Sequence, residues 1–419
     1  MASSKDGGPI PSLANAKWLK RPATAAVLAA LQADGAEARV VGGAVRNALM
    51  GLPVKDIDMA TTALPAEVMR LAAAAGLDAV PTGIEHGTVT VIAEHVPIEV
   101  TTLRRDIETF GRHARVTFTH DWSEDARRRD FTMNALYCAA DGTVHDPLGG
   151  YRDLAARRVR FIGEARARIR EDFLRILRFF RFFATYDPAP APDEEGLAAA
   201  IAEKAGLAQL SGERIRAELL LLLAAPRAVE AIRTMHEVRL IEPLLGARGD
   251  VERLTRLAAI ETALGRDADA LLRLAALALG PDCDAARLQE WLRLSAAETA
   301  RLLQAAVHHA AFSPASAERE AQGFIYRHGS QAFVDGALMA WAASGDGPGD
   351  AARAHRVRLP ERWQAPELPV RGADVLALGA RPGPEVGRVI SAFETWWIAQ
   401  GFPADRERAK GKLGELVRG

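Results

Sequence analysis

The chain has 419 residues, a formal net charge of −1 and an apolar content of 49%. This length can bury a large core and predicts two to four domains. The balanced charge excludes a protein that attracts nucleic acid through its overall field, so any such affinity must come from local basic patches. The two cysteines, Cys138 and Cys283, are far apart and lack metal-ligand spacing. They exclude a disulfide framework and indicate a cytoplasmic protein.

No apolar run has membrane-spanning length, and the small, polar segment from Met1 to Pro11 predicts a loose tail instead of a signal peptide. Trp18 to Gln32 has helical periodicity and ends at Asp34-Gly35, so a helix is expected to lead into the first strand. Ala and Leu dominate after about residue 160, where strand-forming residues become rare. We therefore expect an α/β front followed by a nearly all-helical back.

A glycine pair follows the first predicted strand, which ends at Val40-Val41. Gly42-Gly43 allows the backbone to turn sharply and to approach a ligand closely. Ala44 to Met50 then predicts a short helix that Gly51 and Pro53 stop. A Gly-rich turn that opens onto a helix presents free amide groups, so this turn is a candidate phosphate site. Taken alone, the same pattern also fits an ordinary tight turn.

Two carboxylates come next, in a run from Asp56 to Met59 that predicts a strand. Because side chains alternate along a strand, Asp56 and Asp58 should project from the same face. Glu99 lies in the second strand of a predicted hairpin, formed by Thr88–Ala93 and Pro97–Leu103, and could face the same site. Carboxylates beside a phosphate site are what Mg²⁺-dependent phosphoryl or nucleotidyl transfer requires. The alternative for each of the three is a solvated surface position.

The remaining front part contains three further predicted features. Leu64 to Ala75 predicts a helix that stops at Gly76, and Asp141-Gly142 predicts a hairpin turn. Arg104 to His120 is polar, contains Gly111 and four arginines, and predicts a mobile loop. Mobile loops beside a site often close over substrate.

Arg168 to Tyr186 predicts one amphipathic helix with an apolar stripe and a charged side. Asp172 lies about one turn before Arg175, so the two are expected to lie close enough to pair. The window from Arg104 to Arg181 holds 17 Arg and no Lys against 12 Asp plus Glu. An excess carried by Arg alone favours planar, bidentate contacts with phosphates and bases.

In the C-terminal part of the chain, Pro-rich and Gly-rich segments separate the predicted helices. Asp187 to Glu194 is a Pro/Ala linker, and Leu/Ala-rich helices follow to about Phe333. Gly345 to Gly349 is a Gly-rich break. A last helical segment spans Gly387 to Ala399, and the end of the chain is basic.

The order of these motifs carries a resemblance. The chain resembles the class II tRNA nucleotidyltransferases, the bacterial and eukaryotic CCA-adding enzymes that share a superfamily with bacterial poly(A) polymerases. The resemblance covers roughly residues 20 to 240 and rests on Gly42-Gly43, Asp56-Ile57-Asp58, Arg128-Arg129-Asp130-Phe131-Thr132, Asp146-Pro147-Leu148-Gly149-Gly150, Glu171-Asp172-Phe173-Leu174-Arg175 and Glu213-Arg214. One departure is Asn47, where the family commonly has Asp; Asn keeps an acceptor oxygen and loses the charge.

The resemblance implies a polymerase-β-like α/β head followed by helical parts. The resemblance divides this chain into an N-terminal tail and helix (1–35), a nucleotidyltransferase head (36–154), a helical neck for base recognition (155–225), a helical body (226–335) and a helical, tRNA-binding tail (336–419). It also implies template-independent addition of CCA to tRNA that lacks its 3′ CCA, from CTP and ATP. No membrane and no protein partner is implied.

The resemblance implies a role for each candidate residue. Asp56 and Asp58 would hold Mg²⁺ as catalytic ligands, and whether Glu99 joins them stays open. The nucleotide-binding residues would be Gly42, Gly43 and Arg46 for the triphosphate, Arg129, Asp130 and Asn134 for the ribose, and Asp172, Arg175 and Arg178 on the neck helix. Asp172 and Arg175 match the residues that read the base, since a carboxylate accepts from the amino groups of C and A while a guanidinium donates to their acceptors.

Three other functions stay open at this point. Poly(A) polymerase and CC-only or A-only addition belong to the same reaction class. The segment from Arg105 to His120 is not shortened, whereas a shortened loop in this family would favour CC-only addition. A catalytically idle RNA-binding module is the third possibility, and the intact Asp56/Asp58 pair argues against it.

Overall fold

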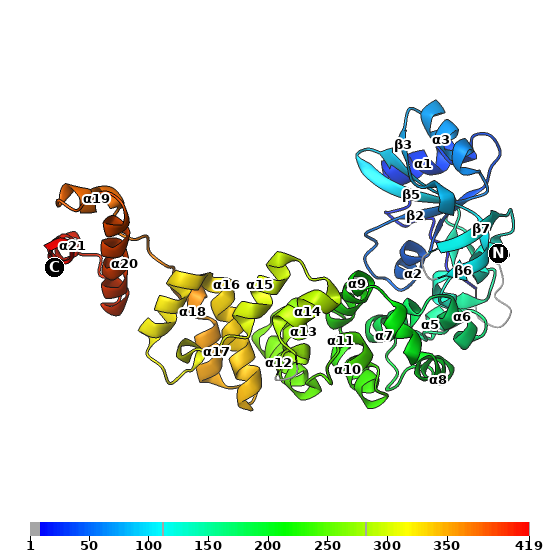
Figure 1. Ribbon diagram of the computed structural model, residues 1–419. Helices are drawn as coiled ribbons and strands as arrows, with labels where there is room; N and C mark the ends of the chain where they lie inside the picture. Colours follow the sequence, from blue (N-terminus) through cyan, green and yellow to red (C-terminus); the bar gives the residue numbers. More distant parts are fainter. Residues whose placement is uncertain (1–8, 111–112, 281–282, 419) are drawn as a thin grey trace. The chain divides into compact units, whose positions relative to one another are not determined.

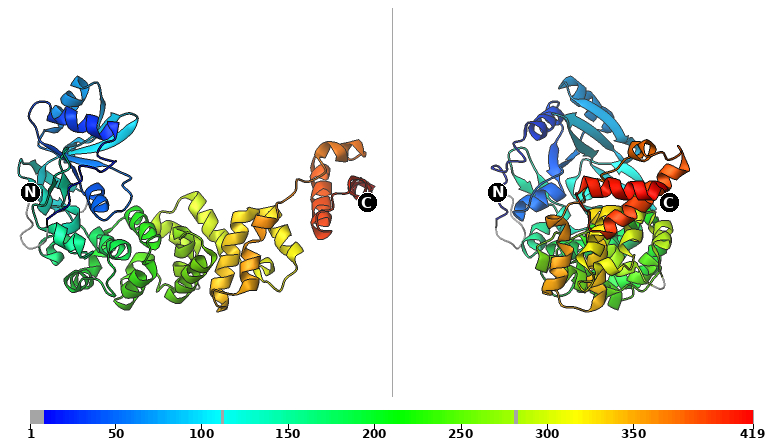
Figure 2. Two further views of the ribbon diagram at one scale, coloured as in Figure 1. Left: turned by 180° about the vertical axis from the view of Figure 1, so that it is seen from behind. Right: turned by 90° about the vertical axis from the view of Figure 1, so that its left-hand side faces the viewer.

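The computed structural model describes residues 9–110, 113–280 and 283–418. It forms two compact units, one up to Gly246 and one from Ala247 onward, and each is described by itself. The first eight residues of the expected N-terminal tail and Gly111 of the expected loop lie outside the described residues. Figures 1 and 2 show both units coloured along the chain.

The first unit is built on a seven-stranded mixed sheet with the order β3-β4-β5-β2-β1-β8-β9 (Figure 1). β2 and β5 are parallel, and the other neighbouring strands are antiparallel. The strands are β1 (Ala38–Val41), β2 (Asp58–Thr61), β3 (Asp78–Gly83), β4 (Thr88–Ala93), β5 (Val96–Thr102), β8 (Tyr137–Cys138) and β9 (Val144–His145). Helices α1 and α3 pack against each other and against β4. The mixed α/β front is therefore confirmed.

Several local predictions are confirmed at residue level. Glu94 and His95 adopt positive φ angles of 50° and 62° between β4 and β5, which is the twist a two-residue hairpin turn requires. Gly142 has φ 85° between the paired strands β8 and β9. Helix α3 ends before Gly76, as its stop signal predicts.

Three predictions about the front are wrong. β2 begins at Asp58, so Asp56 lies just before the strand and does not alternate with Asp58 within it. The described residues between Arg104 and Phe118 form two antiparallel strands, β6 (Arg104–Phe110) and β7 (His113–Phe118), where a loop was expected. The first helix begins at Pro22, because proline favours the first helical position, and Trp18 is buried ahead of it.

The helices of the first unit continue from the sheet into an all-helical part. They are α1 (Pro22–Gln32), α2 (Gly43–Leu49), α3 (Pro65–Ala74), α4 (Trp122–Arg127), α5 (Gly150–Ala155), α6 (Ala165–Glu171), α7 (Leu174–Tyr186), α8 (Glu194–Ala202), α9 (Gly212–Leu223), α10 (Ala228–Glu237) and α11 (Ile241–Leu245), with short 3-10 turns η1 (Ile84–His86), η2 (Thr132–Asn134) and η3 (Lys204–Gln209). Phe131 packs its ring against those of Phe161, Phe179 and Phe182, so aromatic contacts join the segment after α4 to α7.

The expected single helix from Arg168 to Tyr186 is broken. Asp172 has φ −155° and ψ 106°, which ends α6, and its side chain accepts a hydrogen bond from the amide of Leu174 at the start of α7. The helical periodicity runs through the break because both helices bury their apolar sides, and periodicity alone does not locate a capping carboxylate.

The second unit is all helical where it is described, as the composition predicts. Its helices are α12 (Val251–Leu264), α13 (Ala270–Ala278), α14 (Ala285–Leu292), α15 (Ala296–Ala305), η4 (Ala310–Phe312), α16 (Glu318–Ser344), α17 (Ala351–Val357), α18 (Leu359–Arg362), α19 (Gly372–Ala377), α20 (Pro384–Ala399) and α21 (Arg406–Arg418). Gly329 kinks α16, and the expected Gly345–Gly349 break separates α16 from α17. Throughout the described ranges, no helix is long and apolar enough to cross a bilayer.

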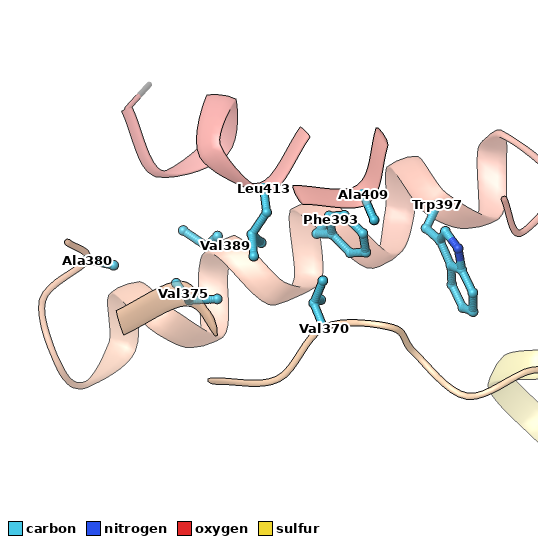
Figure 3. Close-up of a cluster of buried hydrophobic side chains, with 8 residues drawn as sticks. All are labelled: Val370, Val375, Ala380, Val389, Phe393, Trp397, Ala409 and Leu413. Carbon is cyan, nitrogen blue, oxygen red and sulfur yellow. The ribbon is translucent and has the colours of Figure 1, made fainter. Parts of the chain in front are cut away.

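The last three helices share a small hydrophobic core. Figure 3 shows Val389 and Phe393 of α20 beside Leu413 and Ala409 of α21, with Val370 on the segment that precedes α19. Phe393 is fully buried, and burying such a side chain stabilises a fold by about 2–3 kcal/mol.

Candidate active site

The Gly42-Gly43 turn lies between two arginines. Gly42 has φ 72° and ψ −123°, a backbone conformation that strongly favours glycine. A Cβ added to Gly42 would lie 3.7 Å from Nη1 of Arg129, and one added to Gly43 would lie 3.6 Å from Nη2 of Arg46. The backbone and two guanidinium groups therefore converge on this turn.

The three candidate carboxylates line one cavity of about 570 Å³. Asp58 and Glu99 are register partners on the neighbouring parallel strands β2 and β5, and Asp56 joins them from the segment before β2. Burial raises the pKa of Asp58, the nearby charges of Glu99 and Asp56 raise it further, and Arg129 opposes the rise. The structure thus brings all three side chains to one cavity, and Asp56 reaches it from outside the strand.

The carboxylates do not form a closed metal cage. Within the described ranges, no group of three or more His, Cys, Asp or Glu side chains is arranged to hold a metal ion by itself. Mg²⁺ is commonly held by one or two carboxylates, substrate phosphates and water. Crowded carboxylate oxygens next to a phosphate-sized turn fit that kind of site, because a cation would relieve the repulsion that raises the pKa of Asp58.

Arg129 is fixed by two residues that the sequence did not single out. Its Nη2 lies 3.0 Å from Oδ2 of Asp125, and its Nε donates to the hydroxyl of Tyr137 at 3.3 Å. The Tyr137 hydroxyl in turn donates to Asp125 at 2.8 Å. Burial would raise the pKa of Asp125, but the charges of Arg129 and Arg128 outweigh it and lower the pKa to about 2. The buried carboxylate is therefore ionised and holds Arg129 beside Gly42.

Arg46 is buried, 7% exposed, and its described hydrogen bonds go to uncharged groups. It donates to Oδ1 of Asn134 at 2.6 Å, to Oδ1 of Asn47 at 2.9 Å and to the hydroxyl of Tyr186 at 2.7 Å. Its guanidinium carbon also lies 4.4 Å from the ring centroid of Tyr186. Burial lowers the pKa of Arg46, with the charge of Asp130 opposing. Tyr186, at the end of α7, is a site residue that sequence reasoning missed.

Asp130 connects the sheet-bearing part to α7. Its Oδ1 accepts from Nδ2 of Asn134 at 2.9 Å, and its Oδ2 lies 2.5 Å from Nη2 of Arg178. Burial opposes ionisation of Asp130, but Arg178 and these hydrogen bonds hold its pKa well below the ordinary range. Arg178 also donates to Glu218 on α9 at 3.2 Å, and Glu218 accepts from Arg181 at 2.6 Å. The candidates Asn134, Asp130 and Arg178 thus form one network.

Asp172 and Arg175 do not pair with each other, which corrects the expectation from their spacing. Oδ2 of Asp172 lies 2.7 Å from Nη2 of Arg214 on α9. Arg175 instead donates to Glu171 at 2.7 Å and to the carbonyl of Arg168 at 2.8 Å. The helix break at Asp172 turns its carboxylate toward α9, so the helical i,i+3 geometry that pairing requires is absent.

The residues that sequence reasoning missed could in part have been found. Glu218 follows Arg214 by four residues on α9, so the two lie on one face of the helix. The same face contacts α7, where Glu218 pairs with Arg178 and Arg181. Asp125 precedes Arg128 and Arg129 at helical spacings of three and four, which signals an intrahelical pair. Tyr186 has no such local signal, because its partner Arg46 lies 140 positions away.

The chain is similar to known proteins over most of its length. The family described as "Poly A polymerase head domain" matches residues 38–160, and the one described as "Probable RNA and SrmB- binding site of polymerase A" matches residues 193–247. The chain is 34% identical over 402 residues to a CCA tRNA nucleotidyltransferase 1, mitochondrial, from Danio rerio, which covers 90% of this chain and 87% of that relative. It is 30% identical over 399 residues to a CCA-adding enzyme from Limosilactobacillus fermentum, covering 94% and 96%. A crystal structure of the Bacillus stearothermophilus CCA-adding enzyme in complex with CTP superposes with a TM-score of 0.74 at 30% identity, covering 94% of this chain and 97% of that one.

Proposed function

The chain belongs to the CCA-adding tRNA nucleotidyltransferases, and from this premise we propose that it adds C, C and A to the 3′ end of tRNA that lacks them, using CTP and ATP without a template. Near-full-length similarity to enzymes of that name supports the activity. The structural observation that carries it is the meeting of Asp56, Asp58 and Glu99 at one cavity, one strand away from the Gly42-Gly43 turn.

The reaction requires the 3′ oxygen of the RNA to attack the α-phosphorus of the nucleotide while the bond to pyrophosphate breaks. We assign the triphosphate to Gly42, Gly43 and Arg46, as the resemblance implies. We add Arg129, which the resemblance placed at the ribose, because two guanidinium groups at a glycine turn match the charge of the triphosphate and its need for close approach. The carboxylates are the proposed ligands for a divalent cation. Such a cation, for which we propose Mg²⁺, would activate the attacking hydroxyl and offset charge on the leaving pyrophosphate.

Asp130, Asn134 and Arg178 are proposed to bind and position the ribose. Their side chains hydrogen-bond one another, so a ribose hydroxyl would enter a network whose rotamers are already fixed. This arrangement lowers the entropy cost of placing the α-phosphorus in line with the RNA oxygen.

Asp172 and Arg175 are proposed to read the base edge. Asp172 accepts from Leu174 and Arg214, and an ionised carboxylate still has further acceptor positions for an exocyclic amino group. Glu171 and the Arg168 carbonyl bind Nη1 of Arg175, and the Arg128 carbonyl accepts a long hydrogen bond from Nη2 at 3.5 Å. These contacts orient the guanidinium, and Nε and the second hydrogen of Nη2 are the donors that we propose for a base acceptor. Uracil and guanine reverse much of this pattern, which favours C and A.

The division into head (36–154), neck (155–225), body (226–335) and tail (336–419) is likewise a proposal. Helix α16 runs through residues 335 and 336, so this helix belongs to both of the last two parts. A cytoplasmic location is proposed from the two buried free thiols, Cys138 and Cys283. Cell fractionation tests it against the mitochondrial location named for the Danio rerio relative.

The deciding assay is incorporation of radiolabelled CTP and ATP into tRNA that lacks its terminal CCA. Incorporation of two C and one A is expected. Long tails from ATP alone would indicate poly(A) polymerase, C without A would indicate CC addition, A without C would indicate A-only addition, and no incorporation would indicate an RNA-binding module. The same reactions with a chelator, then with Mg²⁺ or Mn²⁺ restored, test the metal.

A further inference from the structure

The cavity that holds the carboxylates has a second, cationic side. Arg21, Thr24 and Lys55 line the same cavity as the acidic residues Asp56, Asp58 and Glu99. Arg21 and Lys55 are exposed, and within the described ranges neither makes an ion pair. The cations and the carboxylates thus share one space without neutralising each other through direct contact.

The first turn of α1 contributes one unpartnered hydroxyl, that of Thr24, to the cavity lining. Arg21 is the residue that precedes the helix, its side chain makes no capping hydrogen bond, and Pro22 has no amide hydrogen. Thr24 is 1% exposed, and its hydroxyl is a buried polar group without a hydrogen-bond partner in the described part of the chain. A buried hydroxyl without a hydrogen-bond partner is unfavourable, so its presence in the lining of a cavity points to a ligand.

The order of the strands separates this side from the Gly42-Gly43 turn. Asp58 on β2 pairs with Val41, the residue before Gly42, on one side, and with Glu99 on β5 on the other. The cavity continues from Glu99 to Thr90 on β4 and to the start of α1, and neither Gly42 nor Arg129 lines it. The carboxylates therefore have an arginine-bearing turn on one flank and the α1 cavity on the other.

A nucleotidyl transfer brings two anionic reactants to the same carboxylates, and the triphosphate is assigned to the Gly42-Gly43 flank. We propose that the α1 cavity binds the last phosphodiester of the RNA acceptor, with Arg21 and Lys55 as cationic contacts and Thr24 as a hydroxyl donor. This inference rests on the proposed function, because the reaction requires an RNA 3′ hydroxyl at the carboxylates. Arg21, Thr24 and Lys55 would be positioning residues for that hydroxyl.

The first test compares single charge removals. Arg21→Ala and Lys55→Ala should each raise KM for tRNA lacking CCA about tenfold while KM for CTP stays unchanged, since a hydrogen bond to a charged group contributes about 1.5–3 kcal/mol. Lys20→Ala is the matched control, because Lys20 is exposed next to Arg21 and does not line the cavity. The slope of tRNA affinity against salt should fall by about one for each removed contact. A rise in KM for CTP with tRNA unaffected would overturn the proposal.

A second test identifies the phosphate. A tRNA acceptor minihelix with a neutral methylphosphonate at its last linkage should bind the wild-type enzyme about tenfold more weakly than the natural RNA. In Arg21→Ala this difference should disappear, because the contact is already lost. If Arg21→Ala keeps the full difference, the phosphate is bound elsewhere.

The hydroxyl has its own test. Thr24→Val removes the unpaired hydroxyl at nearly constant volume, so the melting temperature should stay the same or rise, whereas KM for tRNA should increase severalfold and Thr24→Ser should restore it. An unchanged KM would remove Thr24 from the proposed site. In all three tests, wild-type incorporation of C and A confirms the reaction independently. If the wild type adds C and A but the variants do not show the expected changes in tRNA binding, this inference is contradicted. If the wild type itself adds neither C nor A, the proposed function is contradicted.

Discussion

The carboxylate cavity and the junction between α6, α7 and α9 arrange charge in opposite ways. In the cavity, burial and then the like charges of Glu99 and Asp56 raise the pKa of Asp58, and in the described residues none of the three carboxylates forms an ion pair. At the junction, Asp130, Glu171, Asp172 and Glu218 each meet a guanidinium within 2.5–3.2 Å. This difference indicates that where like charges lie together without partners, a ligand has to supply the opposite charge. Paired charges mark a place where the protein fixes its own geometry.

Removing a cavity carboxylate is expected to have the largest effect on activity. Asp58→Ala should lower turnover by at least about a thousandfold, because a cation ligand worth several kcal/mol is lost. Since the pKa of Asp58 is raised in the fold, its ionised form weakens the fold at neutral pH, and that weakening disappears as the pH falls below the raised pKa. The melting temperature of the variant at pH 7 should therefore equal or exceed that of the wild type. Turnover within about tenfold of wild type would contradict the assignment.

A paired carboxylate should behave in the opposite way. Asp125→Asn leaves Arg129 buried without its partner, so the free energy of unfolding should fall by about 3–5 kcal/mol at pH 7. Because the pKa of Asp125 is lowered to about 2, its contribution is present above the unfolded pKa of 3.8 and is lost as the pH falls through about 2. Urea unfolding at pH 7, 4 and 2.5 should show the difference from wild type shrinking with pH. A difference that does not depend on pH would refute the role of the charge.

Asp172 belongs to both sides of this comparison, because its carboxylate pairs with Arg214 and is also proposed to bind the base. Asp172→Ala should reduce the CTP/UTP ratio of kcat/KM by about one to two powers of ten, since a well-placed polar contact contributes about 1–3 kcal/mol. Arg214→Ala is the control that removes only the ion pair. If both variants lose selectivity equally, Asp172 acts by fixing the helix break and does not itself read the base.

The smallest effect is expected at an exposed pair far from either network. Arg70 and Asp34 lie 2.6 Å apart, and each side chain is 57% exposed. Arg70→Ala should change the free energy of unfolding by less than about 1 kcal/mol, because solvent and salt screen such pairs. Incorporation of CTP should not change. A larger loss of activity would mean that surface charge contributes to RNA binding beyond the described networks.

The carboxylate cavity could be predicted from the sequence because it follows from local rules. A strand, a glycine turn and a hairpin each carry their own signals, and strand pairing then brings Asp58 and Glu99 together. The junction could not be predicted in the same way. The partners Asp172 and Arg214 lie 42 positions apart, and their pairing depends on how α9 packs beside the α6–α7 break. Asp130 and Arg178 lie 48 positions apart, and their pairing depends on how the segment after α4 packs on α7.

The polar segment after Arg104 was mispredicted for a different reason. Its two strands carry several charged residues, which have low β propensity, and Gly111, between them in the sequence, suggested a loop. Residues 111 and 112 lie outside the described residues. A role of this segment in the switch from C to A therefore stays a prediction, tested by whether deletion of Phe110 to Arg115 stops addition after CC.

The buried guanidinium of Arg46 has a thermodynamic consequence. Its described hydrogen bonds go only to neutral oxygens, and burial lowers its pKa, so the fold holds a desolvated cation that these hydrogen bonds and the charge of Asp130 only partly offset. An anionic ligand would add counter-charge. By linkage, a ligand that binds only the native state makes that state more stable. The buried cation thus lowers the stability of the ligand-free enzyme and raises its affinity for anions. The melting temperature with bound ligand should therefore depend more on the number of phosphate charges than on the identity of the base.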